Sequence, residues 1–317
     1  MRRLVLIIFF IISNCCIAQV GKVSVTVLDE QTNVLANTEV SASFSTLEKA
    51  WHAGPSNRFK KNTNNKGFCS IIGHGNGGSC IIYVTRKGYY HSYEEIHFKN
   101  KVGIGRLATW QPWNSEFKLY LTKIDNPTPM YVKSLMNEDL PCKNKRIGYD
   151  FRIGDWVYVG YAGKHTDIYF YVGNLTTNNN SKYESGEGLI VSFPNDGDGL
   201  IPLDIPDYRN RGMRMPKVAL VTGFEPVLVK FARPGAGGGF EEKKSMHYFL
   251  RVNTEKDKNG DIIKANYGKI YNDFTGDRRG RMNFIYYLNP TSDDRNIEYD
   301  NSTNLVENVL RKNIYSP

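Results

Sequence analysis

The chain has 317 residues, of which 40% are apolar and 41 are Lys or Arg against 32 Asp or Glu. This length suits two domains of about 150 residues, each able to bury a core. The basic residues are scattered and accompany no amphipathic helix, so the charge pattern predicts no nucleic-acid partner.

Residues 1–18 have the anatomy of a secretory signal peptide. A short basic start, residues 1–3, precedes an apolar run over 4–12, and small side chains at Cys16 and Ala18 come before Gln19. The apolar run is too short to cross a bilayer, and no later segment is long and apolar enough to do so. We therefore predict export to the periplasm, the cell surface or the medium.

A lipoprotein is the alternative at this leader, with the lipid on Cys15 or Cys16. A lipid-attachment site has a small residue just before the cysteine, whereas that place here holds Asn14 or Cys15. The sequence therefore favours a cleaved leader over a lipid anchor.

Residues 19–125 are predicted to form short strands separated by polar turns. Apolar and polar side chains alternate with period two, as in half-buried strands, over residues 23–28, 39–44, 81–85, 93–98 and 116–121. No amphipathic helical stretch interrupts them. This spacing predicts a small β-sandwich.

Four segments of this region stand in a familiar order. They are a strand ending in Asp at 23–29, Leu-Ala-Asn-Thr-Glu-Val at 35–40, Thr-Asn-Asn-Lys-Gly-Phe at 63–68 and Val-Thr-Arg-Lys-Gly-Tyr at 84–89. Together they resemble the carboxypeptidase regulatory-like, or transthyretin-like, domain family. The sequence departs from the family at Asn33, where the first hairpin usually has Gly, and in a long insert at 48–61. The resemblance implies a seven-stranded sandwich that serves as an accessory or spacer module of an exported bacterial protein. It implies no catalytic residue.

Residues 126–130 are predicted to be a linker, because alternating prolines favour extended backbone and cannot continue a central strand. The remainder, 131–317, is predicted to be a larger antiparallel β-sandwich. Its predicted strands are 155–161, 167–172, 188–193, 217–222, 227–232, 247–254, 261–271 and 282–288. Asn259-Gly260 is a strong signal for a tight hairpin between two of them.

One short helix is predicted near the C-terminus. Asn301 or Ser302 suits its N-cap, and Leu305 and Val309 lie on an apolar stripe with i, i+4 spacing. The predicted fold class is therefore all-β, with two sandwiches and a single short helix.

Three cysteines remain after the leader. Cys69 and Cys80 flank a glycine-rich turn, so they are predicted to face each other across a hairpin, where export would permit a disulfide. The alternative of two free thiols stays open. Cys142 has no His within ten residues and is interpreted as a packed residue.

Asp196 and Asp198 stand in an Asp-Gly-Asp-Gly segment that resembles an oxygen-rich calcium loop. They are the candidate metal ligands, because calcium takes six to eight oxygens. The spacing does not match an EF-hand, and Asp with Gly also forms ordinary turns. No motif predicts a cofactor.

Aromatic residues make up 13% of the chain and are the candidate ligand-binding groups. Trp110 and Trp113 lie in one predicted loop, and Tyr89 and Tyr90 lie near another. Exposed aromatic faces can stack on sugar rings, whereas the alternative is that these rings fill and edge the sheets.

The predicted function is a non-catalytic binding or structural module of the cell envelope, with a glycan or another envelope protein as its partner. No Gly-x-Ser-x-Gly elbow is present to anchor a hydrolase triad. The alternative function is a secreted polysaccharide hydrolase, whose acid and base carboxylates would meet across strands of the C-terminal domain. Nothing in the sequence indicates an oligomeric state.

Overall fold

The computed structural model describes residues 19–46, 55–104, 107–176, 185–205, 213–235 and 238–307. These residues form twenty β-strands and no α-helix, so the predicted all-β class is confirmed. The chain divides into two compact units. Unit 1 comprises Met1–Lys87 and His91–Leu121, and unit 2 comprises Gly88–Tyr90 and Thr122–Pro317. The predicted signal peptide lies outside the described residues.

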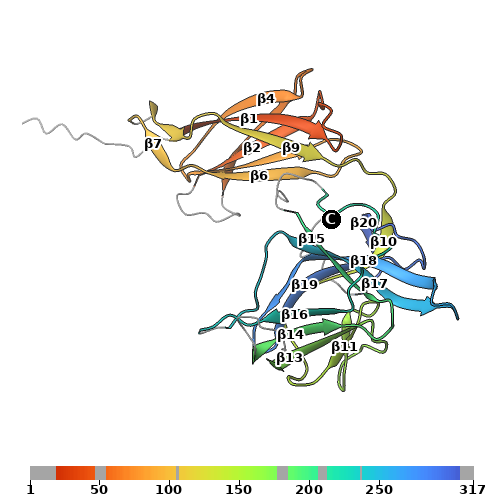
Figure 1. Cartoon of the computed structure of the whole chain (residues 1–317). Coiled ribbons are helices and arrows are strands. Elements are labelled where there is room, and N and C mark those ends of the chain that lie inside the picture. The colour runs from red at the N-terminus through yellow and green to blue at the C-terminus, as the bar shows by residue number, and fades with distance from the viewer. Residues whose placement is uncertain are drawn as a thin grey trace, which may run out of the picture. The chain divides into compact units, whose positions relative to one another are not determined.

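Unit 1 is a sandwich of two sheets (Figure 1). The first sheet contains β1 (Gln19–Asp29), β4 (Phe68–Gly75), β7 (Asn100–Val102), β8 (Thr109–Gln111) and β9 (Ser115–Leu121). In it β1 is central, antiparallel to β4 and parallel to β9. The second sheet is antiparallel, in the order β3 (Ser56–Asn62), β2 (Glu39–Ser45), β5 (Ser79–Thr85) and β6 (Ser92–His97). Most of β3 comes from the insert at 48–61.

Phe44 of β2 lies at the centre of the core of unit 1. Its ring is 1% exposed, stacks on Phe98 with centroids 6.4 Å apart and meets Phe59 edge-on at 5.9 Å. Strand β4 passes this ring at Gly73, where a Cβ would lie 2.3 Å from Phe44 Cε2. Glycine therefore permits the close approach of β4 to the phenylalanine.

Unit 2 is a second sandwich, and its larger sheet has six strands. Their order is β15 (Gly199–Asp204), β17 (Met246–Lys256), β18 (Ile262–Gly276), β19 (Arg281–Leu288), β10 (Thr128–Asp139) and β20 (Tyr299–Asn304). The five strands of the other sheet are β12 (Asp155–Val157), β11 (Ile147–Asp150), β13 (Ile168–Thr176), β14 (Ser185–Ser192) and β16 (Val227–Phe231).

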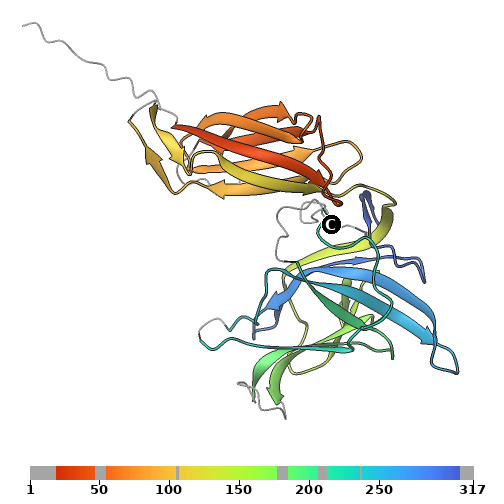
Figure 2. The same cartoon turned by 45° about the horizontal axis from the view of Figure 1, so that its top comes forward.

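The β17–β18 hairpin extends beyond the neighbouring strands (Figure 2). It turns at the predicted place, where the Asp257 N–H donates to the Asp261 carbonyl at 2.8 Å. Gly260 has a φ of 89°, a value that glycine adopts without the steric cost a side chain would bring. The Asn-Gly prediction is therefore confirmed.

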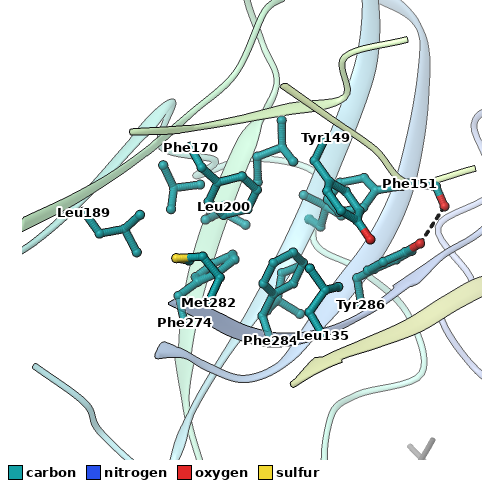
Figure 3. Close-up of a cluster of buried hydrophobic side chains, with 14 of the residues drawn as sticks. Leu135, Tyr149, Phe151, Phe170, Leu189, Leu200, Phe274, Met282, Phe284 and Tyr286 are labelled. Carbon is teal, nitrogen blue, oxygen red and sulfur yellow. Dashed lines mark hydrogen bonds between the residues drawn. The ribbon is translucent and has the colours of Figure 1, made fainter. Parts of the chain in front are cut away.

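The six-stranded sheet is buried on both faces. One face packs on the five-stranded sheet through an aromatic core that includes Tyr149, Phe170, Phe284 and Tyr286 (Figure 3). In this core the Tyr286 hydroxyl donates to the Phe151 carbonyl at 2.8 Å. Burial on two faces explains why β17 and β18 each contain long runs of buried residues instead of an alternating pattern.

The opposite face of the six-stranded sheet carries a second core, the outer core. It contains Phe249, Tyr267, Tyr271, Ile285 and Tyr287 from the sheet. Residues from connecting segments cover them, among them Ile205, Met215, Ala219 and Ile297. Segments with no regular strand pattern therefore complete this core.

Four predictions for the region after residue 125 differ from the structure. The predicted linker is shorter, because β10 begins at Thr128; Pro129 is tolerated near the start of a strand. The strand predicted at 155–161 ends at Val157. The chain then turns at Gly160, whose φ is 88°. Residues 217–222 form a single bridge, from Val218 to Asn296, and no strand.

The fourth difference concerns the predicted N-cap of a C-terminal helix. Asn301 and Ser302 lie in β20, where the strand pairs in parallel with β10. This tertiary pairing overrides the local capping preference. The rest of the predicted helix, including Val309, falls outside the described residues.

Candidate functional site

The four aromatic candidates do not form one exposed surface. Trp110 is 6% exposed, stacks on Phe98 with centroids 5.8 Å apart, and donates its indole N–H to the Gly75 carbonyl at 2.8 Å. A buried indole whose face stacks on another ring and whose N–H is hydrogen-bonded is a core residue. The expectation that Trp110 offers a stacking surface is corrected accordingly, in favour of the core interpretation.

Tyr90 is also buried, at 5% exposure, and its hydroxyl donates to Glu298 Oε1 at 3.0 Å. Tyr89 is half-buried. Trp113 alone among the four is exposed, at 41%. Two of the candidates therefore serve packing, because a large β core takes up aromatic rings wherever its strands place them.

Asp196 and Asp198 point to different surroundings. Asp198 is 1% exposed and accepts hydrogen bonds from the Thr254 N–H at 2.8 Å and the Asn195 side chain at 2.9 Å. Asp196 is exposed and pairs with Lys256 at 2.6 Å. In the described part of the chain, no group of three or more His, Cys, Asp or Glu side chains could hold a metal ion. The two aspartates thus act here as a turn anchor and a surface ion pair.

Cys69 and Cys80 are both free and buried. They lie on opposite sheets, so the predicted hairpin between them does not exist. Cys80 pairs with Phe44, whose ring lies against Gly73 of β4. Cys69 lies four residues before Gly73 in β4, about 13 Å from Gly73 at the rise of an extended strand. A disulfide requires Cα atoms within about 7 Å, so the disulfide prediction is wrong for this structure.

The carboxylates of Asp150 and Asp167 are both buried and interact electrostatically, and both bind backbone N–H groups. Asp150 accepts four N–H groups, those of Arg152, Ile153, Lys164 and His165, at 3.0–3.1 Å. Asp167 accepts the Phe151 N–H at 2.8 Å and the Asn253 side chain at 2.9 Å. Burial raises the pKa of Asp167. These contacts organise the loops around Phe151, Lys164 and Asn253.

A pair of tyrosines that the sequence reasoning did not select lies on the outer face of the four-stranded sheet of unit 1. Tyr83 of β5 pairs with Tyr93 of β6, and their ring centroids lie 6.1 Å apart with planes at 34°. Tyr93 is 38% exposed and Tyr83 half-buried. The alternation in 81–85 was the available signal, because Tyr83 falls opposite the buried Ile82 and Val84.

The register places polar side chains around this pair. Lys60 and Ser41 continue the row of Tyr83 and Tyr93 across β3 and β2. The next row on the same face contains Arg58, Ser43, Ile81 and Glu95. We call these eight residues the tyrosine face.

The three charged residues of the tyrosine face each have a partner. Arg58 donates its Nε–H to the Ser43 hydroxyl at 3.2 Å. Lys60 pairs with Glu39 at 2.9 Å, and His97 approaches Glu95 at 3.4 Å. Two tyrosine rings, flanked by charged and hydroxyl side chains, therefore lie on one face of the four-stranded sheet.

No family model matches the sequence, and no curated protein matches it. Solved structures give slight likenesses. A 3-chlorocatechol 1,2-dioxygenase from Rhodococcus opacus 1CP is 12% identical with a TM-score of 0.24, over 33% of this chain and 60% of that one. An Acinetobacter radioresistens catechol 1,2-dioxygenase mutant is 11% identical with a TM-score of 0.26, over 35% and 54%.

The major pilin subunit BcpA of Bacillus cereus is 13% identical with a TM-score of 0.25, over 77% of this chain and 91% of the pilin. The chain therefore spans 60% or less of the two dioxygenases and most of the pilin. Similarity at this level carries no argument about activity. None of the described segments forms a helix with the length and hydropathy that crossing a membrane requires.

Proposed function

We propose that this protein is an exported, non-catalytic binding module of the cell envelope, and that its tyrosine face binds a glycan chain. The tyrosine pair is the observation that carries the proposal. Its two rings provide a broad apolar surface, and Tyr is a residue that serves binding surfaces at low cost in conformational entropy. A pyranose chain matches this surface, because it offers apolar C–H faces to the rings and hydroxyls to Arg58, Lys60 and Glu95.

Export is part of this proposal and is supported by the anatomy of residues 1–18. The relation of unit 1 to carboxypeptidase regulatory-like domains is part of it as well, supported by the motifs at 23–29, 63–68 and 84–89. Sequencing the N-terminus of the purified product tests the export step. A start at Gln19 agrees with it, whereas an uncut leader on a cytosolic product contradicts it.

The binding step is tested with the mature chain on an array of envelope polysaccharides, followed by titration calorimetry on the best ligand. Replacing Tyr83 and Tyr93 by Ala removes the stacking surface, and we expect affinity to fall at least about tenfold, the change that corresponds to 1.4 kcal/mol. Trp113→Ala is the matched control, because Trp113 is exposed but lies outside the tyrosine face.

Unchanged affinity in the double tyrosine variant contradicts the glycan site. Loss of binding in Trp113→Ala alone would place the site elsewhere. The same polysaccharides test the alternative function, a polysaccharide hydrolase. Release of reducing ends when the mature chain is added would contradict a non-catalytic module.

A further inference from the structure

Two nitrogen donors lie buried without an acceptor in the outer core of unit 2. Lys269 is in the middle of β18 and His247 is at the start of β17, and both are 0% exposed. Neither Lys269 Nζ nor His247 Nε2 has a hydrogen-bond partner among the residues that the structure describes. Unsatisfied buried donors are uncommon in native proteins, and each one calls for an explanation.

The register places these two residues on the same face of the paired strands β17 and β18. Phe249 of β17 pairs with Lys269, and His247, two residues before Phe249, projects from the same face. His247 and Lys269 are therefore diagonal neighbours, within reach of long side chains. Tyrosine rings border both of them. The imidazole lies 5.0 Å from the Tyr271 ring, and Lys269 Nζ lies 4.8 Å from the centroid of Tyr287.

The hydrogen bonding of His247 makes its Nε2 a donor. The Asn272 N–H donates to His247 Nδ1 at 3.1 Å, so Nδ1 is the acceptor nitrogen and the proton of the neutral ring is on Nε2. Burial, together with the positive charges of Arg214 and Lys269, lowers the pKa of His247 to about 4. At neutral pH the imidazole is therefore uncharged and presents one N–H to the outer core.

A third cationic group lies beside them. The Arg214 guanidinium stands 5.1 Å from the centroid of the Tyr271 ring. Its charge acts on His247 from the segment that covers the sheet. At His247 the two cations, Arg214 and Lys269, therefore act more strongly than the carboxylates.

The carboxylates that act on these groups are held by other partners. Glu298, the one that acts on Lys269, accepts hydrogen bonds from the Tyr90 hydroxyl and the Asp125 and Asn126 N–H groups at 2.8–3.0 Å. The two that act on His247 are Asp204 and Asp273. Asp204 is bonded to Lys243 and Ser245, and Asp273 to Lys230 and Tyr248.

From these contacts we propose that a small monovalent anion, of the size of chloride or formate, binds between Lys269 Nζ and His247 Nε2. The anion accepts one hydrogen bond from each nitrogen, and Arg214 contributes to the attractive field. Complete burial of both donors restricts the ligand to a small one. A single ammonium at the contact favours a single negative charge.

The anion also determines the charge state of Lys269. Burial lowers the pKa of Lys269 to about 7, and a negative charge at hydrogen-bond distance raises it again by favouring the ammonium. Anion binding thus stabilises the outer core by giving the Lys269 ammonium a hydrogen-bonded counter-charge.

The test uses the mature chain and chloride as the probe. Thermal unfolding is followed while chloride replaces isethionate, an anion too large for the site, at constant ionic strength and pH 7. We expect the Tm to rise logarithmically with chloride concentration once the site begins to fill. In Lys269→Met this rise should disappear. Lys264→Met, on the same strand with a side chain that is 47% exposed, should retain it.

Crystals soaked in bromide provide a second measurement that does not depend on a folded variant. An anomalous peak between Lys269 and His247 supports the site. Absence of that peak overturns the proposal, as does a Tm that is insensitive to chloride or a rise that persists in Lys269→Met. In those cases Lys269 is a neutral amine satisfied by water.

Discussion

The ammonium nitrogen of Lys230 lies 2.5 Å from Asp273 Oδ1 in the interior of unit 2. Lys230 belongs to the edge strand β16 of one sheet, and Asp273 belongs to β18 of the other. Asp273 also accepts hydrogen bonds from the Tyr248 hydroxyl at 2.6 Å and the Lys243 N–H at 2.9 Å. This buried network joins the two sheets, and an inward-pointing charge on an edge strand also discourages unwanted strand pairing.

We expect Asp273→Ala to lower the free energy of unfolding by about 3–5 kcal/mol, because it leaves the Lys230 ammonium buried without its counter-charge. The double variant Asp273→Leu with Lys230→Met should recover much of that loss. Urea unfolding of the single and double variants measures the coupling. Glu255→Ala, which breaks the exposed ion pair of Glu255 with Lys264, is the control. A loss in Asp273→Ala no larger than the loss in this control would show that the Lys230–Asp273 pair does not hold the sheets together.

Stability should fall in mild acid because of His247. Its pKa is about 4 in the folded protein, against 6.5 when unfolded. Between these values the unfolded chain binds the proton and the native chain does not, so stability is lost as the pH falls from 6.5 to 4. The expected contribution to the slope is about 1.4 kcal/mol per pH unit.

His247→Phe should reduce the loss of unfolding free energy between pH 6.5 and 4, as measured by urea unfolding at a series of pH values. His91→Phe is the control, because His91 is exposed and should leave this loss as it is. Equal slopes in the wild type and His247→Phe would mean that His247 titrates normally in the folded state.

Gly73→Ala should destabilise unit 1. The new methyl group would lie 2.3 Å from Phe44 Cε2 and 2.7 Å from Phe59 Cδ2, and overpacking of this kind costs about 1–3 kcal/mol. Adding Phe44→Leu should restore part of the loss by making room. Gly186→Ala, whose methyl group would meet its nearest atom at 4.0 Å, is the control in differential scanning calorimetry. A Gly73→Ala melting temperature equal to that of the control would refute the close approach.

The cysteines should remain thiols after purification in air. Burial raises the pKa of Cys69 to about 11, and the pKa of Cys80 is raised further by its deeper burial. Neither forms appreciable thiolate at neutral pH, so neither should react with a thiol reagent before unfolding. Cys142, which is only half-buried, should react in the native state. Mass spectrometry of the alkylated protein measures which cysteines react. A protein mass two units below that of the fully reduced chain, which indicates a Cys69–Cys80 disulfide, would contradict the prediction.

How far the sequence predicts this structure depends on the range of the interactions involved. Alternation over 39–44 and 116–121 predicted β2 and β9, because the apolar side chains that face the core recur with period two along each strand. The same rule gave no indication that β17 and β18 are buried on both faces, since that depends on the segments near Met215 and Ile297 that cover the outer core. The rule also could not distinguish the buried Trp110 from the exposed Trp113. Trp110 is buried because it packs on Phe98, a contact that the local pattern does not reveal.

By itself, the sequence determined the all-β class and the hairpin at Asn259-Gly260, because side-chain periodicity and turn conformation are local properties of the backbone. The tertiary structure alone decided that Tyr83 meets Tyr93, that Cys69 and Cys80 stay apart, and that Lys269 and His247 share a buried face. Each of those relationships joins different strands, and sheet register sets it through contacts between residues that local patterns do not connect.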